Sequence, residues 1–169
     1  YFSSDKDGMS YDDQGRLLAF KESRRSSEAE SLLTTKRRSN TVYNALGQEV
    51  SFDEDDATQS SLDEHPLEST SHLERRNAAY DTSGRLIRYE DSTLQNGVLA
   101  QVVRRTDTAF NSYGLLEKKT EQQSVSGQDS RSGATLRVRS SQTERLTYDN
   151  EGRQNGLHEE SWSDSAGNS

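Results

Sequence analysis

One short signature recurs along this chain of 169 residues and limits most strongly how it can fold. The signature is an aromatic residue, then Asp or Asn, then two variable residues, then Gly. It begins at Tyr11, Tyr43, Tyr80, Phe110 and Tyr148. Because one motif returns at separations of 32, 37, 30 and 38 residues, we expect one structural unit to be used repeatedly.

Each copy of the signature predicts the tip of a β-hairpin. Asp or Asn at the start of a type I turn can bond its own backbone two residues on, and Gly three residues later closes the loop in the left-handed conformation. The predicted Asp and Asn positions are Asp12, Asn44, Asp81, Asn111 and Asp149. The predicted left-handed glycines are Gly15, Gly47, Gly84, Gly114 and Gly152.

The hairpin model predicts which residues face each other across the strands. In four hairpins a basic residue is expected opposite an acidic one, an arrangement that stabilises an antiparallel pair. The pairs are Lys6 with Glu22, Arg38 with Glu54, Arg76 with Glu90, and Arg105 with Glu121. The fifth hairpin lacks such a pair, and His158 is expected to face Glu144 there. Alternation along the strands puts Phe20, Phe52 and Tyr89 beside the charge pairs, and the five signature aromatics are expected to form a structural ladder.

The fold class that follows is all-β: an antiparallel meander of repeated hairpins, forming an extended sheet or a solenoid-like array of about ten strands. We expect a single repeat array over residues 1–169, which is a window on a longer protein. The hairpin units are predicted at 1–25, 32–56, 72–93, 98–123 and 135–169. The second turns are expected within 26–31, 57–71, 124–134 and 164–167 and at Asn96-Gly97, the strongest hairpin dipeptide in the chain.

Composition alone predicts disorder, because only 28% of the residues are hydrophobic. The repeat reconciles this with folding, since arrays obtain order from the interfaces between neighbouring units. The net charge of −8 and the mixing of basic with acidic residues argue against a nucleic-acid partner. Cysteine is absent, which excludes disulfides and thiolate metal sites, and no apolar run is long enough to span a membrane.

Acidic clusters are the most suggestive candidates for a bound cation. Asp53, Glu54, Asp55 and Asp56 could gather calcium, and Asp5-x-Asp7-Gly8 imitates the start of a calcium loop, but that loop's later bidentate Glu is missing. A solvated turn is the favoured interpretation. His65, His72, Glu64 and Glu68 share one loop without a helical frame, so no metal site is predicted there.

Catalytic signatures are missing too. The sequence contains no Gly-x-Ser-x-Gly elbow and no phosphate-binding glycine loop, so we predict no enzyme activity and no cofactor. Exposed Tyr, Arg and Trp162 leave glycan binding by stacking as an alternative.

The best copies of the signature carry a family likeness. Tyr-Asp-x-x-Gly-Arg-Leu, at residues 11–17 and 80–86, resembles the YD repeat of Rhs-type and teneurin-type surface proteins and bacterial Tc-toxin components. The resemblance implies a long antiparallel β-sheet in a large bacterial protein that is secreted or surface exposed. In the Rhs family such a sheet forms a hollow shell around a toxic C-terminal domain.

These expectations lead to one main functional hypothesis and two alternatives. The main hypothesis is a structural segment of an extracellular bacterial filament, stalk or wall protein, whose partners are further copies of itself or adjacent repeats, joined through sheet edges or faces. The alternatives are a shell segment of an Rhs-like toxin and a glycan-binding adhesin module.

Overall fold

The computed structural model describes residues 2–26, 29–60, 68–128 and 135–167, and these residues form strands and turns without a helix. The strands are β1 (Phe2–Tyr11), β2 (Leu17–Ser26), β3 (Ala29–Tyr43), β4 (Glu49–Ser60), β5 (Glu68–Tyr80), β6 (Leu86–Gln95), β7 (Leu99–Arg105), β8 (Ala109–Phe110), β9 (Leu116–Gln128), β10 (Thr135–Tyr148) and β11 (Gln154–Gly167). The all-β antiparallel meander predicted from the sequence is confirmed. The strands follow chain order from β1 to β11, with β8 and β7 both beside β9.

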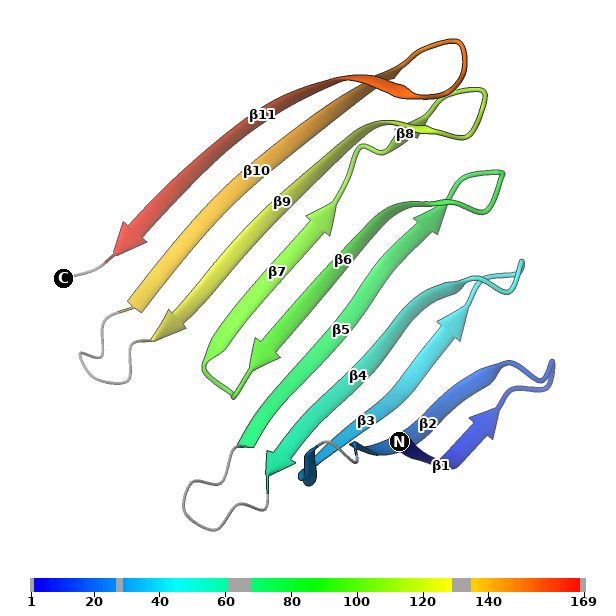
Figure 1. The fold of residues 1–169 in the computed structure, drawn as a ribbon, viewed down its shortest axis with the longest axis vertical. Helices are drawn as coiled ribbons and strands as arrows, with labels where there is room; N and C mark the ends of the chain where they lie inside the picture. The colour runs from blue at the N-terminus through cyan, green and yellow to red at the C-terminus, as the bar shows by residue number, and fades with distance from the viewer. Residues whose placement is uncertain (1, 27–28, 61–67, 129–134, 168–169) are drawn as a thin grey trace. The chain divides into compact units, whose positions relative to one another are not determined.

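The chain divides into two compact units. The first comprises residues 1–76 and 93–98, and the second comprises residues 77–92 and 99–169. In the first unit β1 to β4 are successive antiparallel neighbours, and the first part of β5 pairs with β4 (Figure 1). In the second unit β9 pairs with β7 and β8 on one side and with β10 on the other, and β10 pairs with β11.

The signature glycines sit in left-handed backbone at the tips of the hairpins. The φ angles of Gly15, Gly47, Gly84, Gly114 and Gly152 lie between 76° and 82°. A side chain clashes with its own backbone in this region, so glycine is favoured at the position. At the opposite end of the first unit, Asn96 and Gly97 both have positive φ, as a two-residue type I′ turn requires.

A second recurring feature near the tips keeps the strands in register. From Tyr43 to Val42 on β3 the facing residue on β4 changes from Glu49 to Ser51, so β4 has one extra residue there. From Val42 to Ser39 the facing residue changes from Ser51 to Asp53, so here β3 has one extra residue. Asn40 provides that second bulge with a φ of 54°. The same two shifts occur in the β1–β2 hairpin, where Gly8 has a φ of 59°. The two bulges cancel, so the predicted facing pairs beyond them are preserved.

The fifth hairpin has only the first of these bulges, and one sequence prediction is wrong there. His158 faces Arg145 and not Glu144, because the extra residue on β11 is never matched by one on β10. Strand lengths also differ from expectation. The ladder continues through residues 164–167, where Asp164 faces Arg139, so the predicted turn at that place is strand. β4 continues to Ser60 and β5 begins at Glu68, so both strands extend into the predicted 57–71 turn.

Burial is sparse. Among the described residues the buried apolar side chains are Phe52 and Ala78, and no large side chain is fully buried. Glu22, Glu54 and Thr41 are buried as well. The part of the chain that the structure describes therefore buries charged groups in its sheet as deeply as apolar ones.

Candidate functional site

The tip loops are built around the side-chain oxygen of the Asp or Asn. In the first loop, Asp12 Oδ1 accepts hydrogen bonds from the backbone N–H groups of Gln14 and Arg16, both at 2.9 Å. The Asp12 backbone N–H donates to the Arg16 carbonyl, and the Gly15 N–H donates to the Asp12 carbonyl. The same four bonds recur in the other four loops, at 2.9 to 3.0 Å.

The identity of the residue after the signature Gly depends on whether the loop begins with Asp or with Asn. Where the loop begins with Asp, the residue four positions later is Arg, and its Nε donates to the second carboxylate oxygen at 2.6 to 2.8 Å. Where the loop begins with Asn44, the residue is Gln48, and the two amides bond each other at 2.7 Å. A charged acceptor is thus matched with a charged donor, and neutral Asn44 with a neutral donor, whereas Leu115 of the Asn111 loop has no side-chain donor.

In the Asp loops the hydrogen bonds lower the pKa of the carboxyl. For Asp12 and Asp81 the largest cause is the backbone N–H of Arg16 or Arg85. For Asp149 the largest cause is the Arg153 side chain. The charged form is the better acceptor, so deprotonation and loop closure favour each other.

Neighbouring tip loops contact each other through the same residues. In the first unit the Arg16 guanidinium lies 4.8 Å from the centre of the Tyr43 ring and donates to the Asn44 carbonyl, and the Tyr43 hydroxyl donates to the Leu17 carbonyl at 2.7 Å. The first hairpin therefore offers an arginine and a carbonyl to the aromatic residue of the second.

The second unit contains the same two kinds of contact, an arginine against an aromatic ring and a tyrosine hydroxyl that donates to a backbone carbonyl. The Arg85 guanidinium lies 4.1 Å from the centre of the Phe110 ring, and the Tyr148 hydroxyl donates to the Leu116 carbonyl at 2.7 Å. An arginine of the earlier loop thus lies against the rings of Tyr43 and Phe110, and the hydroxyls of Tyr43 and Tyr148 bond a backbone carbonyl of the earlier hairpin.

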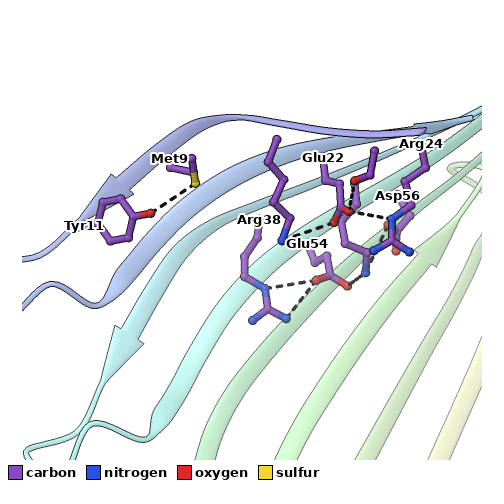
Figure 2. Close-up of polar contacts among 10 residues, drawn as sticks. Met9, Tyr11, Glu22, Arg24, Arg38, Glu54 and Asp56 are labelled. Atoms are coloured by element: carbon purple, nitrogen blue, oxygen red, sulfur yellow. Dashed lines mark hydrogen bonds and ion pairs between the residues drawn. The ribbon is translucent and has the colours of Figure 1, made fainter. Parts of the chain in front are cut away.

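Glu22 and Glu54 are the centres of a charged stripe in the first unit (Figure 2). We use "charged stripe" for Lys6, Glu22, Lys36, Arg38 and Glu54. Glu54 accepts from Lys36 Nζ at 2.6 Å and from Arg38 Nη2 at 3.1 Å, and Glu22 lies 3.8 Å from Lys6 Nζ. Ser4 and Arg24 also donate to Glu22. The facing pairs Lys6 with Glu22 and Arg38 with Glu54 thus lie in the predicted register.

The electrostatics of the stripe depend on its partners. Burial raises the pKa of Glu54, but the hydrogen bonds and charges of Lys36 and Arg38 outweigh it, so the pKa falls below its ordinary value. For Glu22 the hydrogen bond from Arg24 is the main cause of a lowered pKa. Aromatic rings support the bases, with Arg38 4.0 Å from the centre of Phe52.

A related cluster occurs in the second unit. Arg105 faces Glu121 and donates to it at 2.8 Å, and the Tyr89 hydroxyl donates to the same carboxylate at 3.1 Å. Lys119 bridges Glu121 at 3.8 Å and Glu144 at 3.0 Å. The Arg105 guanidinium also lies 5.0 Å from the centre of the Tyr89 ring.

Arg76 and Glu90 belong to different units, so their predicted pairing stays a prediction. Within its own unit Arg76 binds Asp53, and within its own unit Glu90 binds Arg104.

The acidic run 53–56 does not converge on one point. Successive strand residues point to opposite faces, and each carboxylate is bound by a basic or amide side chain, with Lys36 shared by Glu54 and Asp56. Those partners are Asn40 and Arg76 for Asp53, Lys36 and Arg38 for Glu54, His72 for Asp55, and Lys36 for Asp56. Asp5 and Asp7 likewise lie within β1 and face Ser23 and Lys21.

His72 is the described histidine of the predicted loop cluster, and it lies in β5. Its Nδ1 is 2.6 Å from Asp55 and its Nε2 is 3.3 Å from Glu74, and the hydrogen bond to Asp55 is the main cause of its raised pKa. Glu64 and His65 lie outside the described residues. Within the described ranges, no group of three His, Asp or Glu side chains could hold a metal ion, and no helix is long and apolar enough to cross a membrane.

Trp162 belongs to a hollow on the second unit. The hollow has a volume of about 330 Å³ and is lined by Val102, Arg104, Gln122, Gln123, Ser124, Arg139, Ser140 and Trp162. Trp162 is 57% exposed. Sequence reasoning named Trp162 alone, because the other lining residues are brought together by pairing of β7, β9, β10 and β11.

Compared with protein-family models, curated proteins and solved structures, the sequence matches none of them.

Proposed function

We propose that this chain is a structural repeat segment of an extracellular bacterial filament, stalk or wall protein, and that it assembles through sheet edges or faces. The observation that carries the proposal is the contact between successive tip loops, as between Arg16 and Tyr43. Arg16 bonds Asp12 within its own loop, and it also contacts the Tyr43 ring and the Asn44 carbonyl of the next loop. A residue set of this kind suits propagation of a sheet.

The low burial of the array supports the same role. Phe52 is 4% exposed, but Met9, Leu157 and Trp162 are at least half exposed. β1 and β11 stand at the two ends of the strand order, and end strands offer backbone N–H and C=O groups to a further strand. Association with another copy or another repeat would bury this apolar surface and these backbone groups together.

The extracellular and bacterial part of the proposal rests on the resemblance of residues 11–17 and 80–86 to the YD repeat. A shell segment of an Rhs-like toxin uses the same repeat, and the two functions differ in what they assemble. A filament requires contacts between chains, whereas a shell requires that the array close within one chain.

The test is the assembly state of the purified chain. We expect β-rich, regular polymers that grow with protein concentration, observed by sedimentation velocity and electron microscopy. A soluble monomer with a cooperative thermal transition at micromolar concentration would contradict the filament and favour a self-sufficient closed array.

The hollow beside Trp162 supports a second candidate, a glycan-binding module. Sugars stack on exposed aromatic rings and accept hydrogen bonds from Arg and Gln side chains, and Arg104, Gln122 and Arg139 line the same hollow. Because Trp162 is the chain's one tryptophan, its fluorescence reports directly on binding. A saturable change with an oligosaccharide panel that is lost in Arg139→Ala would favour this candidate, and an unchanged spectrum would contradict it.

A further inference from the structure

The contact between the fourth and fifth tip loops lacks a cation that the preceding contact has. Between the third and fourth loops, the Arg85 guanidinium lies 4.1 Å from the centre of the Phe110 ring. Leu115 stands in the fourth loop at the position that Arg85 has in the third. The Tyr148 ring of the fifth loop is therefore not covered by a guanidinium from the loop before it.

The Leu115 side chain takes the same path as that of Arg85 but is shorter and uncharged. A Cβ at Gly114 would lie 3.1 Å from Arg85 Nη1, and a Cβ at Gly152 would lie 3.6 Å from Leu115 Cδ1. Each side chain thus lies against the glycine of the next loop. Because leucine ends where arginine continues, Leu115 stops short of the place that a guanidinium would take.

A hollow of about 310 Å³ lies at this contact. The residues that line it include Tyr113, Leu115, Glu117, Tyr148 and Asp149, and none of its lining residues is a lysine, arginine or histidine. The hollow therefore combines two aromatic residues with two acidic ones, which is a lining suited to a cation.

Glu117 is the carboxylate of this hollow that is available to a ligand. It is exposed and makes no ion pair within the part of the chain that the structure describes. Lys119, two residues further along β9, is already held by two other glutamates. Asp149 differs from Glu117, because its carboxylate binds Arg153 at 2.8 Å. One negative charge in the hollow is thus left without a protein partner.

The two tyrosines supply the aromatic surface. Tyr148 is half-buried, and its hydroxyl donates to the Leu116 carbonyl at 2.7 Å, so the ring is held in place. Tyr113 is 84% exposed, so the hollow is accessible from outside. The face of an aromatic ring attracts a cation, and a planar guanidinium also stacks on it.

We propose that the hollow between the fourth and fifth tip loops binds the arginine side chain of another polypeptide. The guanidinium lies on the Tyr148 ring, as that of Arg85 lies on Phe110, and donates to the Glu117 carboxylate. Arginine is favoured over lysine because a guanidinium can stack and can form two parallel bonds with a carboxylate. Tyrosine and arginine are enriched among the residues that dominate protein–protein binding, which favours a protein ligand over a small cation.

This inference goes beyond the proposed function, because the site lies on the tip loops and does not depend on assembly through sheet edges or faces. Saturation-transfer NMR tests it with N-acetylarginine methylamide as the probe and N-acetyllysine methylamide as the comparison. The method works on monomers and on polymers alike. We expect a saturable signal from the arginine probe and binding of the lysine probe that is weaker by about threefold or more.

Leu115→Arg fills the hollow from within the chain, since it supplies the guanidinium that the third loop has at this position. We expect it to weaken binding of the arginine probe by about tenfold or more. Leu46→Arg is the matched control, because it adds the same charge at a side chain that is 81% exposed in the second tip loop, and it should leave binding unchanged. Glu117→Gln keeps the size of the side chain and should weaken binding by about threefold or more.

Thermal stability provides a second measurement that needs no ligand. If the hollow accepts a guanidinium, Leu115→Arg should raise the thermal midpoint by about 2 to 4 °C relative to Leu46→Arg. Adding Glu117→Gln to Leu115→Arg should remove most of this gain, because the new guanidinium then loses its carboxylate.

Three results would overturn the site. Equal binding of the two probes would show only a general attraction of cations to a chain of net charge −8. Equal binding in Leu115→Arg and Leu46→Arg would place the arginine probe elsewhere on the chain. A wild-type chain that gives no saturable signal would show that the hollow does not take arginine. Each of these results leaves the filament proposal intact, because assembly is measured separately by sedimentation.

Discussion

At the scale of single residues, the Asp or Asn of each tip decides the chemistry of the loop. Its side-chain oxygen satisfies two backbone N–H groups that the turn leaves without a strand partner. The second oxygen of Asp12, Asp81 and Asp149 then bonds an arginine, and for Asp12 and Asp81 that arginine also contacts the aromatic ring of the next loop. The local turn and the contact between repeats are therefore linked through one side chain.

Replacement of a tip glycine tests the left-handed backbone without a packing effect. A Cβ at Gly47 would meet nothing within 4 Å, so the cost of Gly47→Val comes from its φ of 79° alone. We expect a loss of about 1 to 3 kcal/mol in the free energy of unfolding, measured by urea denaturation at fixed protein concentration. Gly47→Asn should cost less, because Asn tolerates this region. A Val variant as stable as the wild type would refute the loop.

The acid sensitivity of the Asp loops is a second expectation at this scale. The backbone N–H of Arg85, followed by its side chain, lowers the pKa of Asp81 in the folded state. A lowered pKa contributes stability above the unfolded value of about 3.9 and loses it as pH falls through the folded value. Asp81→Asn should therefore flatten the fall in stability below about pH 4. Urea titrations at stepped pH measure this, and equal slopes for variant and wild type would contradict it.

At the scale of strands and hairpins, the difference between a buried and an exposed ion pair can be measured in one molecule. The side chains of Arg38 and Glu54 are 21% and 10% exposed, whereas those of Arg145 and Glu160 are 50% and 58% exposed. Double-mutant cycles with Arg→Met and Glu→Gln should give coupling of about 0 to 1 kcal/mol for the exposed pair. For Arg38 with Glu54 we expect about 1 to 3 kcal/mol, as for hydrogen bonds to charged groups.

Equal coupling in the two pairs would mean that Lys36 alone neutralises Glu54, since its Nζ lies 2.6 Å from the carboxylate. Lys36→Met in the Arg38→Met background distinguishes this case. There the buried carboxylate would lose both of its bases, and the stability loss should exceed the sum of the single changes.

Sequence reasoning succeeded for hairpins where local turn chemistry determines the outcome. The signature places each loop, and the facing of Arg38 with Glu54 follows from counting outward from Gly47. Counting failed at His158, because β10 has no extra residue to match the one on β11; in the first two hairpins Gly8 and Asn40, three residues before the aromatic, provide it with positive φ, and Arg145 stands at that position in the fifth. That signal was readable at Gly8, Asn40 and Asn77. The hollow at Trp162 was not readable, since it depends on four strands pairing at a distance.

At the scale of the whole molecule, stability depends on how many hairpins have both neighbours. Repeat arrays gain most of their free energy from interfaces between units, so the end units contribute least. In this chain the ends are where Tyr11 and Arg153 remain exposed. The sparse apolar burial, with Phe52 and Ala78 as its buried members among the described residues, makes each added interface a large share of the total.

A tandem fusion of two copies, with Ser169 followed by a second Tyr1, creates an internal junction in which the Arg153 loop of the first copy can contact the Tyr11 loop of the second, as Arg16 contacts Tyr43. The tether raises the effective concentration of the second Tyr11 loop at the first Arg153 loop, so one end of each copy becomes internal. We expect the thermal midpoint of the fusion to exceed that of the single chain under conditions where the single chain does not associate. The matched control is the same fusion with Arg153→Ala in the first copy only, because that change removes the internal junction and leaves the outer ends intact. Equal midpoints for the fusion and this control would show that the two loops do not support each other.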